Sequence, residues 1–272
     1  MPTIHAPRRA LLALALLLGT PAGWAADNAA ADAAATADKT TPASNWKISA
    51  GPGIYVAPDF PGARSTLVYP IVYQDIDYGG RFFSRGFDLL GVYALNNDVW
   101  QIGADFQFDP TWRRSKDDRR LNGLGDVNMT MRARAFAQAQ VSFITFSADV
   151  AQDIAGQGQG LVANGDVLFS LPAGKWLFTL GPGVTWTNGK YMQTFFGVTA
   201  DQSARSGLPT HAVDAGLREW HANGIVSYEI SHDWSALGSL TFARLRGDAA
   251  SSPVAERRQQ WTAMAAVTYK FR

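Results

Sequence analysis

The sequence contains no cysteine among its 272 residues. Without cysteine, the chain cannot form a disulfide scaffold, use a thiol nucleophile or bind a metal through thiolates. Attachment of a lipid to an N-terminal cysteine is excluded for the same reason. A closed β-barrel in a cell envelope is held by hydrogen bonds between strands, so the absence of disulfides is compatible with that class of fold.

Long hydrophobic runs and a strong charge of one sign are also missing. No stretch reaches about 18 uninterrupted apolar residues, the length that a transmembrane helix requires. The formal net charge is +1, and no basic excess points to nucleic acid as a partner. The Gly-Pro-Gly at 51–53 and the Gly-Leu-Gly at 123–125 lack the following helix and lysine of a phosphate-binding loop. A membrane location would therefore require strands.

Residues 1–25 have the pattern of a secretory signal peptide. Arg8 and Arg9 supply the positive region, Ala10–Leu18 the apolar region, and residues 23–25 a small-x-small cleavage site. A buried N-terminal helix is the alternative. Residues 26–44 are rich in alanine and poor in aromatic residues, which predicts a disordered leader, with a nascent helix as the alternative. We therefore expect an exported protein whose folded domain spans residues 45–272.

The clearest pattern is the two-residue alternation of the last segment, Gln260–Phe271. Its apolar positions are Trp261, Ala263, Ala265, Val267, Tyr269 and Phe271, and most residues between them are polar. A period of two places the apolar set on one face of a β-strand. Aromatic residues stand at both ends of that face, as on a strand whose outer face crosses lipid between two aromatic girdles.

Similar alternation recurs along the rest of the chain. The apolar faces run over Trp100–Phe108, Val127–Ala135, Leu161–Phe169, Trp176–Trp186, Trp220–Ile230 and Trp234–Phe242. A soluble β-sandwich also alternates. Here, however, aromatic residues end several apolar faces, and charged residues lie at mid-strand on the opposite face. Charges that face a polar lumen explain this arrangement.

The connections predict an all-β fold, an antiparallel up-and-down transmembrane β-barrel of about twelve strands. Short connections are expected at Tyr78–Arg81, Asn96–Asp98, Gln138–Gln140, Leu171–Lys175 and Ser231–Asp233. Long ones are expected at Ala57–Ser65, Pro110–Leu124, Ile154–Gly160, Asn188–Arg218 and Gly247–Gln259. Short turns at one end and long loops at the other are typical of such barrels. Arg81–Leu95 is expected to form two short strands around Arg85–Phe87, and ten strands are the alternative if this region and the first strand are irregular.

The candidate functional residues are charges on the inward face. They are Asp105, Asp109, Asp126, Arg132, Arg134, Asp149, Asp166, Glu219, His221 and Glu229. They predict either a salt-bridge network that plugs the lumen or a selectivity constriction. The Glu219-x-His221 pair, with Glu229 on the same face, is the nearest approach to a catalytic cluster, but no nucleophile is paired with the histidine. No spacing resembles a metal site, and we expect neither enzymatic activity nor a cofactor.

Two long loops carry further candidates. The Asn188–Arg218 loop contains Tyr191, Phe195 and Phe196, and a short helix is expected from Thr199 as N-cap through Ala204. Phe195 and Phe196 need other apolar groups to pack against, so we expect the loop to fold back over the barrel mouth. The short helix would then lie as a lid over lumen residues. The basic run at 113–120 predicts a solvated loop or a contact with lipopolysaccharide phosphates.

Several motifs resemble the MipA/OmpV family of Gram-negative outer-membrane proteins. They include GDVNMTMRARAF, LVANGDVLFSLP, YMQTFFGVTADQSARSGLPTHAVDAGL and GPGIYVAPDFPGARS, and the resemblance runs from about Trp46 to the C-terminus. It implies an outer-membrane location among lipids and lipopolysaccharide. It also implies a scaffold that links a lytic transglycosylase to a peptidoglycan synthase, with a narrow channel or an adhesin as alternatives. Tyr269 and Phe271 would then form the signal for the barrel-assembly machinery, which the additional Arg272 could weaken.

Overall fold

The structure, a computed structural model, describes residues 45–115 and 118–271. Twelve antiparallel strands form a closed barrel in which β1 pairs with β12. The strands are β1 (Trp46–Pro58), β2 (Thr66–Tyr78), β3 (Phe82–Arg85), β4 (Asp88–Asn96), β5 (Trp100–Asp109), β6 (Thr130–Val141), β7 (Ile144–Asp153), β8 (Leu161–Ala173), β9 (Trp176–Thr187), β10 (Gly216–Glu229), β11 (Trp234–Leu245) and β12 (Gln259–Phe271). The predicted signal peptide (1–25) and leader (26–44) lie outside the described residues, and so does Arg272.

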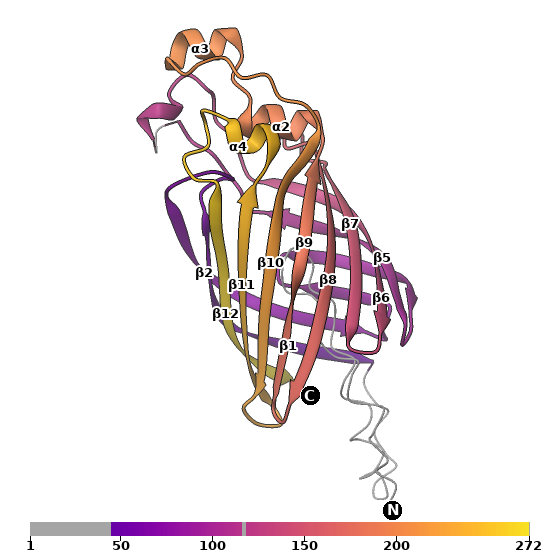
Figure 1. Ribbon diagram of the computed structural model, residues 1–272. Helices are drawn as coiled ribbons and strands as arrows, with labels where there is room; N and C mark the ends of the chain where they lie inside the picture. Colours follow the sequence, from indigo (N-terminus) through magenta and orange to yellow (C-terminus); the bar gives the residue numbers. More distant parts are fainter. Residues whose placement is uncertain (1–44, 116–117, 272) are drawn as a thin grey trace, which may run out of the picture.

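The two ends of the barrel differ as the connection lengths predict. The turn end carries the short connections at 79–81, 97–99, 142–143, 174–175 and 230–233. The loop end carries the long connections at 59–65, 110–129, 154–160, 188–215 and 246–258. In Figure 1 the loops and helices crowd the upper end, and β12 finishes at the lower end. The predicted division of Arg81–Leu95 is confirmed, since β3 and β4 form a short hairpin around Gly86 and Phe87.

Two predicted boundaries are wrong. The turn expected at Gln138–Gln140 lies instead at Ser142 and Phe143, and Ser142 adopts a positive φ of 58°. Gln138 is buried inside the barrel. A polar interior accepts glutamine within a strand, so polar residues there do not mark a turn. Val127 was also expected on a strand, but β6 begins at Thr130, and Val127 forms an isolated bridge with Arg113 inside the loop.

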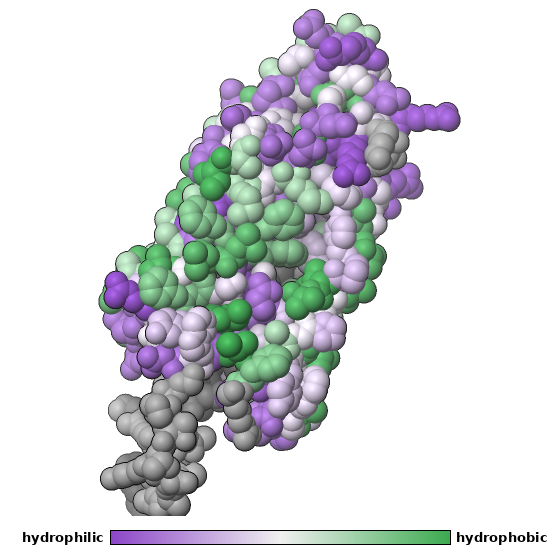
Figure 2. Space-filling view, turned by 180° about the vertical axis from the view of Figure 1, so that it is seen from behind, coloured by the Kyte–Doolittle hydropathy of each residue, from purple (hydrophilic) through white to green (hydrophobic). Residues whose placement is uncertain are grey.

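The outer surface of the wall is apolar, and the inner surface is polar. On β9 the exposed residues alternate with buried Thr179, Thr185 and Thr187. Figure 2 shows hydrophobic residues gathered over the middle of one face and hydrophilic residues over the loop end. Aromatic pairs mark both borders of this surface, Trp176–Tyr228 and Trp234–Tyr269 near the turn end and Trp220–Phe242–Trp261 near the loop end. The predicted lipid-facing pattern with two aromatic girdles is thus confirmed.

The main hydrophobic core lies above the barrel, at the loop end. We call this cluster the cap; its buried members are Phe60, Ala63, Leu121, Leu124, Val127, Tyr191, Met192, Phe195, Phe196, Val198, Leu245, Ala249 and Val254. They come from four long loops and the end of β11. Three helices and a short 3₁₀ turn belong to the same region: α2 (Gly189–Phe196), α3 (Ala200–Ser206), α4 (Gly247–Ser251) and η1 (Arg119–Leu121). No helix in the described ranges is long and apolar enough to cross a membrane.

Candidate functional site

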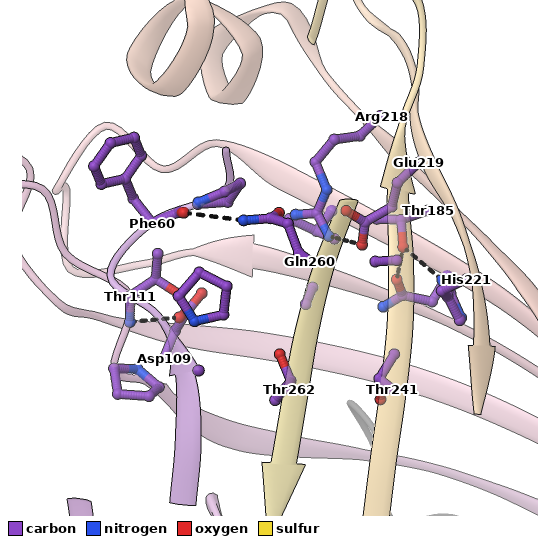
Figure 3. A pocket seen from close by; sticks show the side chains of 18 of the residues that line it. Phe60, Asp109, Thr111, Thr185, Arg218, Glu219, His221, Thr241, Gln260 and Thr262 are labelled. Carbon is purple, nitrogen blue, oxygen red and sulfur yellow. Dashed lines mark hydrogen bonds and ion pairs between the residues drawn. The ribbon is translucent and has the colours of Figure 1, made fainter. Parts of the chain in front are cut away.

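A cavity of about 300 Å³ occupies the barrel directly below the cap. Inward-facing residues of most strands line it, and Tyr191 of α2 closes it from above. Figure 3 shows the polar side chains that converge on it from β5, β9, β10, β11 and β12 and from the 110–129 loop. The labelled ones are Asp109, Thr111, Thr185, Arg218, Glu219, His221, Thr241, Gln260 and Thr262, with Phe60 at the upper border. The interior is therefore a polar chamber under an apolar lid.

Arg132 connects the cavity wall to a buried loop. Its Nε donates to Asp109 Oδ2 at 2.8 Å, and its Nη2 donates to Gln159 Oε1 at 2.8 Å. Gln159 is fully buried and donates to the backbone oxygens of Thr111 and Asn128. Because the guanidinium is held on several sides, it is a fixed positive charge and not a mobile one.

A second polar group surrounds Asp166 on β8, two strands away from Arg132. Its Oδ1 receives hydrogen bonds from Asn223 Nδ2 at 2.8 Å and from His221 Nε2, also at 2.8 Å. His221 Nδ1 lies 3.4 Å from the Thr185 hydroxyl. The histidine therefore sits between a carboxylate and a neutral hydroxyl. That hydroxyl donates its proton to Asn164 Oδ1, so it shows no sign of activation as a nucleophile.

Below the cavity, ion pairs join nearby strands on the inner face of the wall. Arg134 contacts Asp105 and Asp88, and its side chain is 2% exposed. Nearer the turn end, Arg85 pairs with Asp75 at 2.8 Å and is also buried. Charges of both signs thus fill the middle of the barrel, as expected for the predicted salt-bridge network. Asp149 faces inward as predicted and is buried, bound to Asn164 at 3.0 Å.

Two of the candidate charges lie elsewhere. Asp126 is exposed in the 110–129 loop, where its Oδ1 accepts hydrogen bonds from the Ser115 N–H and hydroxyl, both at 2.8 Å. The alternating pattern extended the predicted strand too far into this loop. Glu229 ends β10 at the turn end, whereas Glu219 and His221 line the cavity. The three residues therefore do not form a cluster.

The lid is α2 and not the helix that the sequence predicts. The helix with Thr199 as N-cap is present as α3, and its capping box with Gln202 is complete. None of its residues is buried, however, and Gln202 and Arg205 bind the backbone of the neighbouring loop at Leu124 and Gly123. The hydrophobic side of α3 is too small to cover a lumen.

Helix α2 instead covers the cavity with its apolar face. Phe195 and Phe196 are both fully buried in the cap, and Tyr191 is 3% exposed. The Tyr191 hydroxyl accepts a hydrogen bond from Arg218 Nη1 at 2.6 Å. Burial raises the pKa of the Tyr191 phenol, against the opposing effect of Arg218, so the hydroxyl stays neutral.

Several residues of the site were not among the sequence candidates. Gln159 lies in a loop, and Asp88 begins β4 beside an irregularity in the strand register. Arg113 belongs to the basic run at 113–120, for which the sequence predicts a solvated loop or a contact with lipopolysaccharide. Arg113 is buried and donates to Phe195 O at 3.3 Å. Burial lowers its pKa to about 10, partly offset by Asp126, so the guanidinium is charged at neutral pH. Loop residues that bind distant backbone carry no local periodicity by which to find them.

The polar side chains that line the cavity are suited to hydrogen bonding. Across residues 45–115 and 118–271, no three His, Asp or Glu side chains gather closely enough to hold a metal ion. The chamber is built from carboxylate–guanidinium pairs, amides and hydroxyls, which bind polar molecules by hydrogen bonds.

Comparison with known proteins gives three findings. Residues 50–271 match the family described as MltA-interacting protein MipA. The MltA-interacting protein of Escherichia coli K12 is 27% identical over 96% of this chain and 98% of its own length, and the Shigella flexneri protein of that name gives the same values. A protein provisionally named outer membrane protein YiaT, from E. coli K12, is 22% identical over 84% of this chain and 92% of its own. Among solved structures, an outer membrane channel from Pseudomonas putida F1 covers 86% of this chain at a TM-score of 0.40, with all of its own chain aligned.

Proposed function

Because the chain belongs to the MltA-interacting protein family, we propose that this outer-membrane β-barrel is a scaffold for enzymes of the cell wall. Its partners would be a lytic transglycosylase and a peptidoglycan synthase on the periplasmic side. The observation that carries the proposal is the similarity, along almost the whole chain, to a relative named for its interaction with MltA. A scaffold needs a stable anchor and an accessible docking face, and no lumen through which solutes pass.

The filled interior supports an anchor. Arg134, Asp105 and Asp88 form a buried ion-pair group on the inner faces of β6, β5 and β4, and the cap closes the loop end with a buried apolar cluster. The interpretation of the lumen charges as a salt-bridge network is thus favoured over a selectivity constriction, since each of these groups is already paired with another.

The turn end offers the docking face. Short turns face the periplasm in outer-membrane barrels, and this end is where β12 finishes. A basin of about 110 Å³ lies there, lined in part by charges of both signs that include Lys47, Asp77, Glu229 and Asp233. A concave surface with charges of both signs fits the polar surface of a periplasmic enzyme.

The test measures binding of the two purified enzymes to the barrel in lipid nanodiscs. We expect Glu229→Lys to weaken binding about tenfold, because it reverses an exposed charge of the basin. Asp201→Lys, on α3 at the opposite end, is the matched control and should leave binding unchanged. Absence of binding by the wild-type barrel, or an effect of Asp201→Lys alone, would overturn the proposal.

A narrow solute channel is the second candidate, favoured by the cavity below the cap. Planar-bilayer recordings of the refolded barrel separate the two functions. A scaffold with a filled interior gives no steps of conductance. A channel conducts, and its conductance rises when 194–207 is replaced by a short Gly-Ser linker, because that change removes the end of α2 and all of α3.

A further inference from the structure

The barrel wall is incomplete beside β2. Only Asp75–Tyr78 pair with β3, because the β3–β4 hairpin stops halfway up the wall. At its tip, Gly86 N donates to Gln74 O at 2.9 Å, and Gln74 Nε2 donates to Gly86 O at 2.8 Å. Above this level, no strand of the described chain pairs with the edge of β2 between Thr66 and Tyr73. We call the space between this edge and the end of β5 the wall gap.

The wall gap lies at the depth of the bilayer. Val68 and Val72, which point outward from the unpaired segment, are 58% and 73% exposed. Val68 pairs with Val56 of β1, which pairs in turn with Ala263, two residues from Trp261 of the upper aromatic girdle. Backbone groups without partners are tolerated at this depth where they border a cavity or buried protein. We therefore expect a cavity or buried protein behind the unpaired edge of β2.

The cavity below the cap reaches the β5 side of the wall gap. Its lining includes Asp109, which faces inward, and also Phe108, which follows Phe106 on the outward face of β5. These are the last two residues of β5, so the cavity extends to the end of this strand, beside the wall gap. The ring of Phe87 stands beside this end, with its centroid 5.1 Å from that of the inward Tyr55 and 6.4 Å from that of Phe108.

The polar part of the cavity has an unused hydrogen-bond acceptor. Asn223 is 5% exposed, and its Oδ1 has no hydrogen-bond partner among the described residues, although its Nδ2 binds Asp166. The hydroxyls of Thr241 and Thr262 line the same chamber. A buried acceptor without a donor is unfavourable unless a ligand or water supplies the donor.

The charges of the cavity are already compensated. Arg132 is paired with Asp109, and Arg218 is paired with Glu219 at 2.5 Å. The chamber therefore presents amide and hydroxyl groups without an excess of either charge. A head group that donates and accepts hydrogen bonds and carries no net charge matches it best.

We propose that the wall gap is a lateral portal through which a neutral, hydroxyl-bearing, single-chain amphiphile enters the cavity from the bilayer. The head group donates to Asn223 Oδ1, and the chain passes Phe87 toward the lipid. A cavity of about 300 Å³ accommodates a small head group and the first carbons of the chain. The rest of the chain stays in the hydrocarbon region, against Phe108 and the outer wall. This binding site does not depend on the scaffold function.

The experiment uses a monoacylglycerol that carries a diazirine in its chain, with the barrel folded in phosphatidylcholine vesicles. After photolysis, mass spectrometry should find saturable adducts at Tyr55, Phe87 and Phe108, at least tenfold above those at Leu180. Leu180 is exposed on the outer face of β9, away from the portal, and reports general lipid contact. Equal, non-saturable labelling at all four positions would overturn the portal.

Variants test the head-group site separately. Asn223→Leu should raise about tenfold the amount of unlabelled monoacylglycerol needed to block labelling, because the acceptor is lost. Ser227→Ala, on the same face of β10 but outside the cavity lining, is the matched control and should change nothing. Both variants must keep different mobility on gels before and after boiling, which shows that they fold. Unchanged competition in Asn223→Leu, or equal competition by a fatty acid, would overturn the proposed head-group class.

The ring in the passage gives a kinetic test. The monoacylglycerol should label Phe87→Ala several-fold faster than the wild type and Phe87→Trp several-fold slower. The final amount of adduct should change little. If both variants label at the wild-type rate, the amphiphile does not pass Phe87 and the portal is wrong.

Discussion

At the scale of single residues, the buried charge of Arg134 places the strongest constraint on the barrel. Its guanidinium lies between the carboxylates of Asp88 and Asp105, both side chains of which are 0% exposed. Like charges so close together in a low-dielectric interior repel each other strongly. The arginine is what allows both carboxylates to be buried.

Arg134→Leu should therefore lower the free energy of unfolding by about 3–5 kcal/mol, because it leaves buried carboxylates without a cation. Equilibrium unfolding in guanidinium chloride, with the barrel in lipid vesicles, measures the change. The control is Glu256→Gln, which removes a charge from the partly exposed pair with Arg120 and should cost well under about 1 kcal/mol. Similar values for the two variants would contradict the inferred role of Arg134.

Ala133, next to Arg134, tests which side chains of β6 face the lipid. Ala133 lies on the outer face of β6, among the apolar residues of a groove on the lipid side. Ala133→Arg puts a charge into the hydrocarbon region and should cost roughly 2–4 kcal/mol. Ala133→Leu is the matched control for size and should insert into vesicles as well as the wild type. Equal folding yields for the two variants would show that Ala133 does not face lipid.

The sequence was sufficient to predict most of these orientations, because a period of two assigns every residue of a strand to one face. Arg132, Arg134 and Asp105 face inward as predicted, and Asp105 lies directly opposite Arg134 in the register. Asp88 and Gln159 could not be predicted as partners. One belongs to a strand interrupted by a bulge and the other to a loop, and their contacts depend on the closure of the whole barrel.

At the scale of elements, the two loop helices differ in their roles. Helix α3 has the predicted N-terminal sequence signal, whereas helix α2 covers the cavity. Helix α3 could be predicted because its capping box is local. Helix α2 could not, since its apolar residues become a lid only when Phe60, Leu121 and Val254 arrive from other loops. Local signals predict where a helix begins, and tertiary contacts decide which helix is buried.

Phe196→Ala should loosen the cap without opening the barrel. The ring is fully buried, and its loss leaves a cavity that costs about 3–5 kcal/mol locally. Limited proteolysis of vesicles should then cleave the 188–215 loop several-fold faster, while the boiled and unboiled samples still differ in mobility. Ser203→Ala on α3 is the control and should leave cleavage unchanged. Equal cleavage of both variants would contradict the assignment of α2 as the lid.

The 110–129 loop should loosen in acid. Hydrogen bonds from Ser115 hold the pKa of Asp126 below its ordinary value of 3.8. A carboxyl group with a depressed pKa stabilises the folded loop fully above the ordinary value and loses this effect as the pH falls through the lower, folded value. Protonation also removes the negative charge near buried Arg113.

The protection of amide hydrogens at residues 113–115 and 126–127, measured relative to their intrinsic exchange rates, should therefore be constant above about pH 4 and fall below it. Asp126→Asn should exchange faster at all pH values and lose the acid-dependent step. A step of the same size in Asp126→Asn would assign the acid response to another group.

At the scale of the whole molecule, closure depends on pairing between the first and last strands. Ile54 lies opposite Ala265 in the ladder between β1 and β12. The native chain has no cysteine, so an introduced pair reports on this register without interference. In Ile54→Cys with Ala265→Cys, oxidation should join the two ends of the chain. The pair Ile54→Cys with Ala263→Cys is shifted by two residues and should form far less disulfide.

The unmodified barrel should also migrate differently on gels before and after boiling, because the ladder between β1 and β12 leaves neither terminal strand free to unravel. Identical mobility of the two samples would count against closure.

The cap has a consequence for how this protein can change over evolutionary time. Its apolar side chains come from four of the five long loops, so each loop supplies part of a surface that the others need. A substitution at Phe60 or Leu121 alters the environment of Phe195 on a different loop. The loops should therefore diversify together and resist exchange one at a time between relatives. Helix α3, which buries no residue in the cap, is the exception, and it is the place where this surface can vary freely or accept an inserted epitope.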